Sequence, residues 1–128
     1  MYSPIVLFAY NRPDHTKKVL DALAKNIEAI ESDLYVFIDG PKISTTEKQL
    51  IKIHQTKQLI HRENRFKNIF ITESDYNKGL SKSIIFGVSD VIEKRGKIIV
   101  LEDDIVPSIG FLAYMNLSLI HISEPTRH

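Results

Sequence analysis

The stretch Lys97-Ile98-Ile99-Val100-Leu101-Glu102-Asp103-Asp104-Ile105 decides the fold and points to the chemistry. Its apolar residues have no helical periodicity, so they predict a buried strand that ends in three consecutive carboxylates. Carboxylates this close together repel one another, and a hard divalent cation relieves that repulsion. The same acids also suit a solvated turn that leads to Pro107. The stretch alone leaves both interpretations open.

Composition limits what the chain can be. With 128 residues, 43% hydrophobic and 26% charged, it is typical of one ordinary soluble domain and not of a disordered chain. The 17 basic and 16 acidic side chains are interspersed and give a net charge of +1, which disfavours binding to nucleic acid or to an anionic membrane. The absence of cysteine excludes disulfides, thiolate nucleophiles and sulfur metal sites. No segment is typical of a signal peptide or a transmembrane span, so we expect a soluble, cytoplasmic protein.

Apolar runs alternate with helical patterns along the chain. The runs predict four strands, at residues 4–9, 34–38, 68–72 and in the stretch quoted above. Three helices are predicted between them. The first begins at Pro13 and runs to about Ile30, and the second begins with a capping box at Ser44-x-x-Glu47 and ends near His61. The third is the most clearly amphipathic and ends at Gly96. The apolar stripes of the three helices are, in chain order, Val19, Leu20, Leu23, Ile27 and Ile30; Leu50, Ile53 and Ile60; and Leu80, Ile84, Ile85, Val88, Val91 and Ile92.

This alternation predicts an α/β fold with a Rossmann-like parallel sheet, helices on both faces and the strand order 3-2-1-4. Ligands of such sheets bind outside the carboxyl ends of the strands. Polar residues follow each predicted strand and should converge at that edge. They are Tyr10-Asn11-Arg12, Asp39-Gly40, Glu73-Ser74-Asp75 and Glu102-Asp103-Asp104.

Four segments, in this order, resemble the sugar-donor-binding half of a GT-A glycosyltransferase. They are Phe8-Ala9-Tyr10-Asn11-Arg12-Pro13, Phe37-Ile38-Asp39-Gly40-Pro41-Lys42, Asn77-Lys78-Gly79-Leu80 and Val100-Leu101-Glu102-Asp103-Asp104-Ile105. The chain is most similar to bacterial sugar transferases related to the N-acetylglucosaminyltransferase I group and family 2, in which a Glu-Asp-Asp triplet stands in for the DXD motif. The likeness covers roughly residues 4–116.

The resemblance implies a transferase that moves a sugar from a nucleotide-diphosphate sugar, with a UDP-sugar favoured, to an unknown glycan or other hydroxyl acceptor. It implies that Asp104 binds Mn²⁺ or Mg²⁺ at the diphosphate and that Glu102 and Asp103 lie beside it. Asp39 would then accept a hydrogen bond from the base. Tyr10 and Arg12 would flank the nucleotide, with Asn11 between them in the same segment.

Simpler interpretations of these residues remain open. Arg12 suits a salt bridge to Asp14 or Asp39 as well as a contact with base or phosphate. Asp39 is also a common turn-forming residue before glycine. The segment Asn77-Lys78-Gly79 would bring backbone close to ribose or phosphate at a helix N-terminus, or would only start a helix. Lys42 and Lys78 suit phosphate contacts or a solvated surface.

Other enzyme classes find less support in the sequence. Two histidines seven residues apart in the second helix are too far apart to share a metal ion, and no G-x-S-x-G, G-x-G-x-x-G or P-loop motif is present. A sugar nucleotidyltransferase is the alternative enzyme, although residues 10–13 lack the glycine-rich loop that such enzymes have after the first strand. A non-catalytic nucleotide-binding α/β fragment is the alternative from another class.

The end of the chain calls for a separate prediction. Residues 117–128 look like the conceptual translation of a sequencing adapter, so we expect a non-native tail after an incomplete sugar-donor-binding subdomain at residues 1–116. A native strand or helix end followed by a proline-containing tail is the alternative. The resemblance places the catalytic base downstream of the metal motif, so no catalytic residue is assigned and we expect the chain to be inactive alone.

Overall fold

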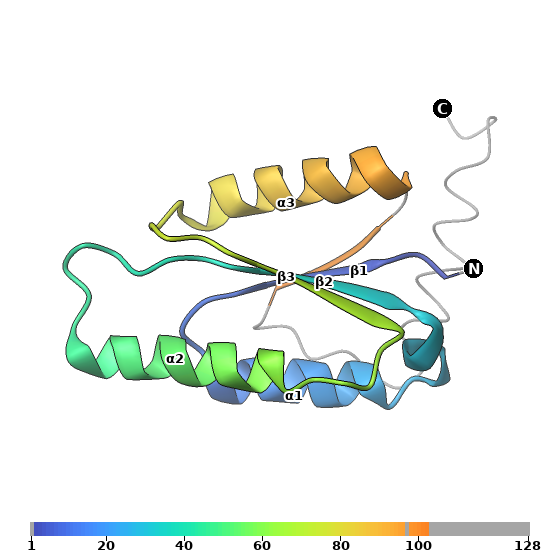
Figure 1. The fold of residues 1–128 in the computed structure, drawn as a ribbon, viewed down its shortest axis with the longest axis horizontal. Coiled ribbons are helices and arrows are strands. Elements are labelled where there is room, and N and C mark those ends of the chain that lie inside the picture. Colours follow the sequence, from blue (N-terminus) through green and yellow to red (C-terminus); the bar gives the residue numbers. More distant parts are fainter. Residues whose placement is uncertain (1, 97, 103–128) are drawn as a thin grey trace.

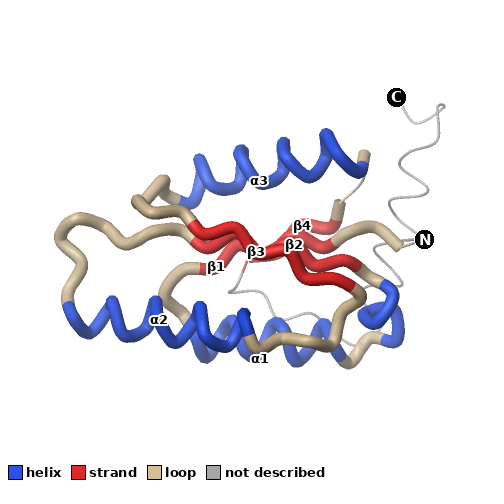
Figure 2. Tube along the Cα trace, in the orientation of Figure 1, coloured by secondary structure: helices blue, strands red, loops and turns tan. Residues whose placement is uncertain are grey.

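The computed structural model describes residues 2–96 and 98–102. The predicted division at residue 116 and the tail at residues 117–128 lie outside this part. Strands and helices alternate along the chain (Figures 1 and 2). The elements are β1 (Ile5–Ala9), α1 (Pro13–Ala24), the 3₁₀-helix η1 (Ile27–Glu31), β2 (Asp33–Ile38), α2 (Glu47–His61), β3 (Asn68–Glu73), α3 (Leu80–Arg95) and β4 (Ile99–Glu102).

The four strands form one parallel sheet in the order β3-β2-β1-β4. Figure 1 shows α1 and α2 on one face of this sheet and α3 on the other. Right-handed crossovers place helices in this way when the chain first moves outward from β1 to β3 and then returns to the other side of β1 at β4. The predicted α/β class, Rossmann-like sheet and strand order are confirmed. No helix in residues 2–96 and 98–102 is long and apolar enough to cross a membrane.

Each face of the sheet carries its own apolar core, because neighbouring residues of a strand point to opposite faces. The larger core, under α1 and α2, includes alternate residues of β1 and β2 together with one side of α1. Its most buried members are Ile5, Leu7, Val19, Leu20, Leu23, Ala29, Leu34, Val36, Ile38, Ile60 and Ile99. The smaller core, under α3, contains Val6, Phe8, Phe37, Val91 and Ile98. This burial on both faces explains why the strand sequences are almost continuously apolar.

The first helix is shorter than the sequence predicts. It ends at Ala24, and the predicted stripe residues Ile27 and Ile30 are 84% and 65% exposed in and around the 3₁₀-helix that follows. Asn26 explains the early end, because its side-chain amide donates to the carbonyl oxygens of Ala22 and Leu23. A side chain that bonds its own backbone in this way competes with helix continuation.

The second helix begins two residues later than its predicted capping box. Thr46 is the N-cap, and its Oγ1 accepts a hydrogen bond from the backbone N–H of Gln49 at 3.2 Å. Thr46-x-x-Gln49 has the same capping spacing as the predicted Ser44-x-x-Glu47, so two overlapping motifs were present and the second one forms the cap. The end at His61 is confirmed, whereas the predicted stripe residue Leu50 is exposed.

The third helix covers the sheet with only part of the predicted stripe. Val91 is buried and Ile84 and Val88 pack against the smaller core, as predicted. The other stripe residues, Leu80, Ile85 and Ile92, are exposed, and Ser83 and Gly87 are buried in their place. A Cβ at Gly87 would lie 2.8 Å from Phe8 Cε1 and 2.9 Å from Phe37 Cδ2, so the absent side chain lets α3 approach the two rings closely. The predicted end at Gly96 is confirmed by its left-handed φ of 79°.

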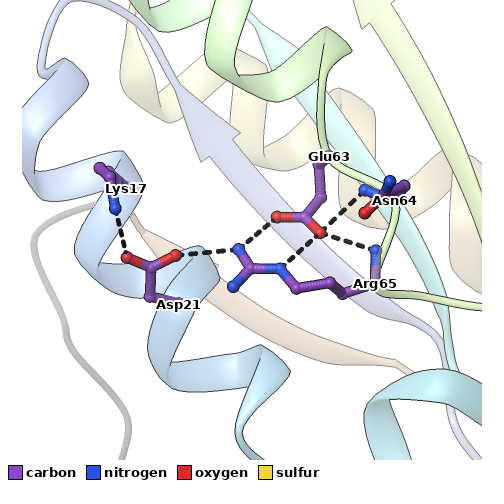
Figure 3. A network of polar contacts seen from close by, with 5 residues as sticks. All are labelled: Lys17, Asp21, Glu63, Asn64 and Arg65. Carbon is purple, nitrogen blue, oxygen red and sulfur yellow. Dashed lines mark hydrogen bonds and ion pairs between the residues drawn. The ribbon is translucent and has the colours of Figure 1, made fainter.

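A polar network holds α1 against the connection between α2 and β3 (Figure 3). Arg65 Nη2 pairs with Asp21 at 2.9 Å and with Glu63 at 2.7 Å, and Lys17 pairs with Asp21. Glu63 Oε2 also accepts from the backbone N–H of Asn64 and of Arg65. Burial alone raises the pKa of Glu63, but the hydrogen bonds from Arg65 and Asn64 outweigh it, and the net pKa lies below the usual value.

We expect Glu63→Gln to lower the free energy of unfolding by about 1–3 kcal/mol at pH 7, since the Glu63 side chain is only 3% exposed and its bonds involve a charged group. The sign of the pH dependence follows from the lowered pKa. The stabilisation is present above the unfolded-state pKa of about 4.3 and is lost as the pH falls below it. Urea titrations from pH 7 to pH 3 should therefore show the two proteins converging in acid. A constant difference over that range would contradict this role of Glu63.

Candidate functional site

The carboxyl ends of the strands meet at one edge, where backbone hydrogen bonds continue past the strands. Asp39 N–H donates to Ala9 O at 3.1 Å, and Ser74 N–H donates to Ile38 O at 2.9 Å. The loops after β1, β2 and β3 are thereby held side by side. This is the edge at which the sequence predicts a ligand site.

The side chain of Asp39 holds the loop that precedes α3 through hydrogen bonds to its backbone. Its Oδ1 accepts from the backbone N–H of Gly40 at 2.9 Å and of Lys78 at 2.8 Å, and its Oδ2 accepts from Gly79 N–H at 3.0 Å. An ionised carboxylate has about four lone-pair sites, so one site on Oδ2 remains for another donor. Asp39 is therefore both the turn-forming residue of the simpler interpretation and a group with spare acceptor capacity at the ligand edge.

Gly40 allows the loop after β3 to lie in close contact with the loop after β2. A Cβ at this position would lie 2.7 Å from Ser74 O and from the backbone N and C of Tyr76. Asn77 Nδ2 donates to Gly40 O at 2.9 Å and closes the contact. The loops after β2 and β3 thus form one hydrogen-bonded unit, and its shape depends on the missing side chain at residue 40.

A pocket of about 250 Å³ opens at this edge, on the α3 side of the sheet. Phe8, Phe37 and Leu80 give it apolar walls, and the rings of Phe8 and Phe37 stack with centroids 5.7 Å apart. The rest of its lining includes four predicted donor-binding residues, which are Tyr10, Asp39, Asn77 and Gly79. Lys42, for which the sequence left a phosphate contact open, and Ser83 also line it. An apolar pocket with a few convergent polar groups is the usual form of a small-molecule site.

The N-terminus of α3 borders this pocket. Gly79 is the N-cap, has a φ of 81° and supplies no side chain, so no side-chain cap covers the first turn of the helix. Free amides and the positive end of the helix dipole favour an anionic group at such a position. The side chain of Lys78 does not line this pocket in the described structure, because its Nζ lies 4.0 Å from the ring centroid of Phe86.

Asn11 and Arg12 lie outside the pocket formed by the other predicted residues. Asn11 Nδ2 donates to Gln49 Oε1 at 2.7 Å and lines a neighbouring hollow of about 220 Å³, which shares Tyr10 and Lys42 with the first pocket. Arg12 is exposed, and its Nη2 lies 3.1 Å from Nε2 of His15. In the described structure Arg12 forms neither of the salt bridges, to Asp14 or to Asp39, that the sequence left open.

The predicted metal site falls almost entirely outside the described residues. The backbone of Glu102 ends β4 and is in register with Phe8, so it reaches the same edge as the pocket, while Asp103 and Asp104 lie beyond the described part. Within residues 2–96 and 98–102 no group of three metal-ligating side chains occurs. The assignment of metal to Asp104 therefore stays a prediction.

Four residues at this edge have no role predicted from the sequence: Phe8, Phe37, Ser83 and Gln49. The two phenylalanines lie near the carboxyl ends of their predicted strands, which places them close to the expected ligand edge. Their apolar character is equally typical of core residues, so the sequence does not distinguish the two roles. Ser83 and Gln49 gave no signal, since each is one polar residue within a helical pattern.

Comparison with known proteins bears on the fold alone. No protein-family model matches the chain, and no curated protein matches its sequence. Among solved structures, the crystal structure of S. aureus TarS, a glycosyltransferase, matches with a TM-score of 0.58 and 18% sequence identity. The match covers 81% of this chain and 17% of the TarS chain. The chain therefore shares its fold with part of TarS and spans about a sixth of the length of that neighbour.

Proposed function

We propose that this chain forms the sugar-donor-binding part of a metal-dependent glycosyltransferase of the GT-A type, which takes a nucleotide-diphosphate sugar. The observation that carries the proposal is the pocket at the carboxyl edge of the sheet, where stacked aromatic rings lie beside Asp39 and an uncapped helix N-terminus. A nucleobase suits the apolar walls, and an anionic phosphate suits the helix amides.

The remaining acceptor position of Asp39 favours a base that has a ring N–H. One acceptor position on its Oδ2 remains after the three backbone hydrogen bonds. A ring N–H of the base, which uracil has on its Watson–Crick edge, would donate to that position. Guanine also has such an N–H, whereas cytosine and adenine have none there at neutral pH, so Asp39 suits a UDP-sugar or a GDP-sugar. The resemblance to GT-A glycosyltransferases makes a UDP-sugar the favoured sugar donor of the two.

The acidic residues after β4 would hold the divalent cation. Oxygen ligands from carboxylates are those that Mg²⁺ and Mn²⁺ prefer, so Asp104, with Glu102 and Asp103 beside it, fits such an ion by its chemistry. The bound ion would act as a Lewis acid that neutralises the departing diphosphate. Within the described residues, Asp39 and the aromatic walls would orient the base, and the amides at the start of α3 would face the anionic part of the ligand.

Binding of UDP with and without Mn²⁺ tests this function. Because the ion joins diphosphate to protein, we expect Mn²⁺ to tighten UDP binding at least about tenfold in calorimetry and to leave UMP binding unchanged. Asp104→Ala should remove the effect of the metal. Glu31→Ala, which alters an exposed acid in η1, is the matched control and should retain it. UDP binding that is indifferent to metal, or unchanged by Asp104→Ala, would exclude the proposed role of the acidic triplet.

A further inference from the structure

The outer side of α3 carries apolar side chains that the fold does not bury. Ile85 is 67% exposed and Ile92 is 44% exposed. Ile85 is two residues from the sheet-facing Gly87 and therefore lies on the opposite side of the helix, and Ile92, seven residues further on, shares its side. Figure 1 shows α3 alone on its face of the sheet, with no other described segment over it. These two exposed side chains, with Ser89 between them, form a strip along the outer side of α3, which is called the stripe below.

The centre of this stripe permits close approach. Ser89 lies one turn from Ile85 and nearly one turn from Ile92, and it is exposed. A small side chain at the crossing point of two helices allows their backbones to come near each other, so that larger neighbours on both sides interlock. The stripe has apolar residues at its two ends and a small residue between them, a pattern that permits close packing of an antiparallel helix pair.

The charges beside the stripe are complementary to those of a reversed copy. Lys82 and Glu93 are exposed, and neither has an ion-pair partner among residues 2–96 and 98–102. They are eleven residues apart, about 16 Å along the helix, which is too far for them to pair within one chain. When a second α3 runs antiparallel, each lysine approaches the glutamate of the other helix.

We propose that the outer face of α3 binds a second copy of this chain, with the two helices antiparallel about a two-fold axis near Ser89. Ile85 of one copy packs against Ile92 of the other, and two equivalent pairs form between Lys82 and Glu93 across the axis. Such an interface is isologous, so it closes at the dimer.

Sedimentation velocity of the full chain over a range of concentrations tests the interface. A monomer–dimer equilibrium is expected, and Ile85→Ser should raise its dissociation constant at least about tenfold, because each dimer buries this side chain twice. Ile85 is exposed in one copy, so circular dichroism and thermal unfolding of the variant at low concentration should match the parent chain. A monomer at every concentration, or association that continues past the dimer, would overturn the proposal.

Charge reversal tests the antiparallel orientation. Lys82→Glu leaves two acidic groups beside the stripe and Glu93→Lys leaves two basic groups, so each variant alone should dimerise about two- to fivefold more weakly at low salt. An equimolar mixture of the two variants should recover the parental dimer fraction, because every cross-pair is again of opposite sign. Lys48→Glu, an exposed change on α2, is the control and should leave dimerisation unchanged. Failure of the mixture to recover would exclude the antiparallel arrangement.

Discussion

Replacement of Asp39 by alanine is expected to lower the free energy of unfolding by about 3 kcal/mol and to weaken UDP binding at least about 100-fold. The carboxylate accepts three backbone N–H groups, two of which belong to the loop before α3. Its loss leaves these partly buried donors without their acceptor and releases Lys78 and Gly79 from the ligand edge. Stability and binding therefore fall together.

Substitution of Asp39 by asparagine separates the effect of the shape of this side chain from the effect of its charge. Asp39→Asn keeps the shape but offers one acceptor oxygen, and its amide group opposes a backbone N–H, so we expect an intermediate loss of both properties. Asp75→Ala removes an exposed acid from the neighbouring loop and should be neutral in both measurements. Urea unfolding and calorimetric titration with UDP provide the two readouts. Parental stability and affinity in Asp39→Ala would show that the loop does not depend on this carboxylate.

The fold could be predicted from the sequence because the sequence patterns that decide it are local. Apolar runs of strand length alternate with helical patterns, and the handedness of crossovers then leaves few arrangements of the strands. The errors occur where one side chain decides between two local structures. Asn26 bonds the carbonyl oxygens that end α1, and Thr46 forms the α2 cap in place of Ser44, which has the same motif spacing. The hydrophobic pattern contains no information about either outcome.

The candidate site could be predicted from the sequence only in part. Parallel strands end at one edge, so residues selected from strand ends met in one pocket: Tyr10, Asp39, Asn77 and Gly79. The partners of their side chains depend on tertiary contacts between segments far apart in the sequence. Examples are the bonds from the residue 78–79 amides to Asp39 and from Asn11 to Gln49. No spacing rule indicates such pairs, and the simple turn-forming interpretation of Asp39 therefore could not be decided from the sequence.

Gly40→Ala tests whether the close approach of the two loops shapes the pocket. The added Cβ would lie 2.7 Å from three backbone atoms of residues 74 and 76, and backbone atoms have no rotamer by which to move away. The loop of residues 74–79 must therefore shift, at an expected cost of about 2–3 kcal/mol in the free energy of unfolding. The shift also breaks the bond from Asn77 to Gly40 O, so UDP affinity should fall about tenfold or more.

Gly96→Ala is the matched control for this substitution. Gly96 has a φ of 79° and no atom within 4 Å of an added Cβ, so alanine there introduces backbone strain of about 1 kcal/mol without a steric clash. It ends α3 at the opposite end of the helix from the pocket, so UDP affinity should not change. The predicted clash at residue 40 is wrong if Gly96→Ala lowers the free energy of unfolding more than Gly40→Ala does. It is also wrong if Gly40→Ala keeps the parental UDP affinity. Because φ is not positive at Gly40, a loss there measures the contact between loops and not the conformational freedom of glycine.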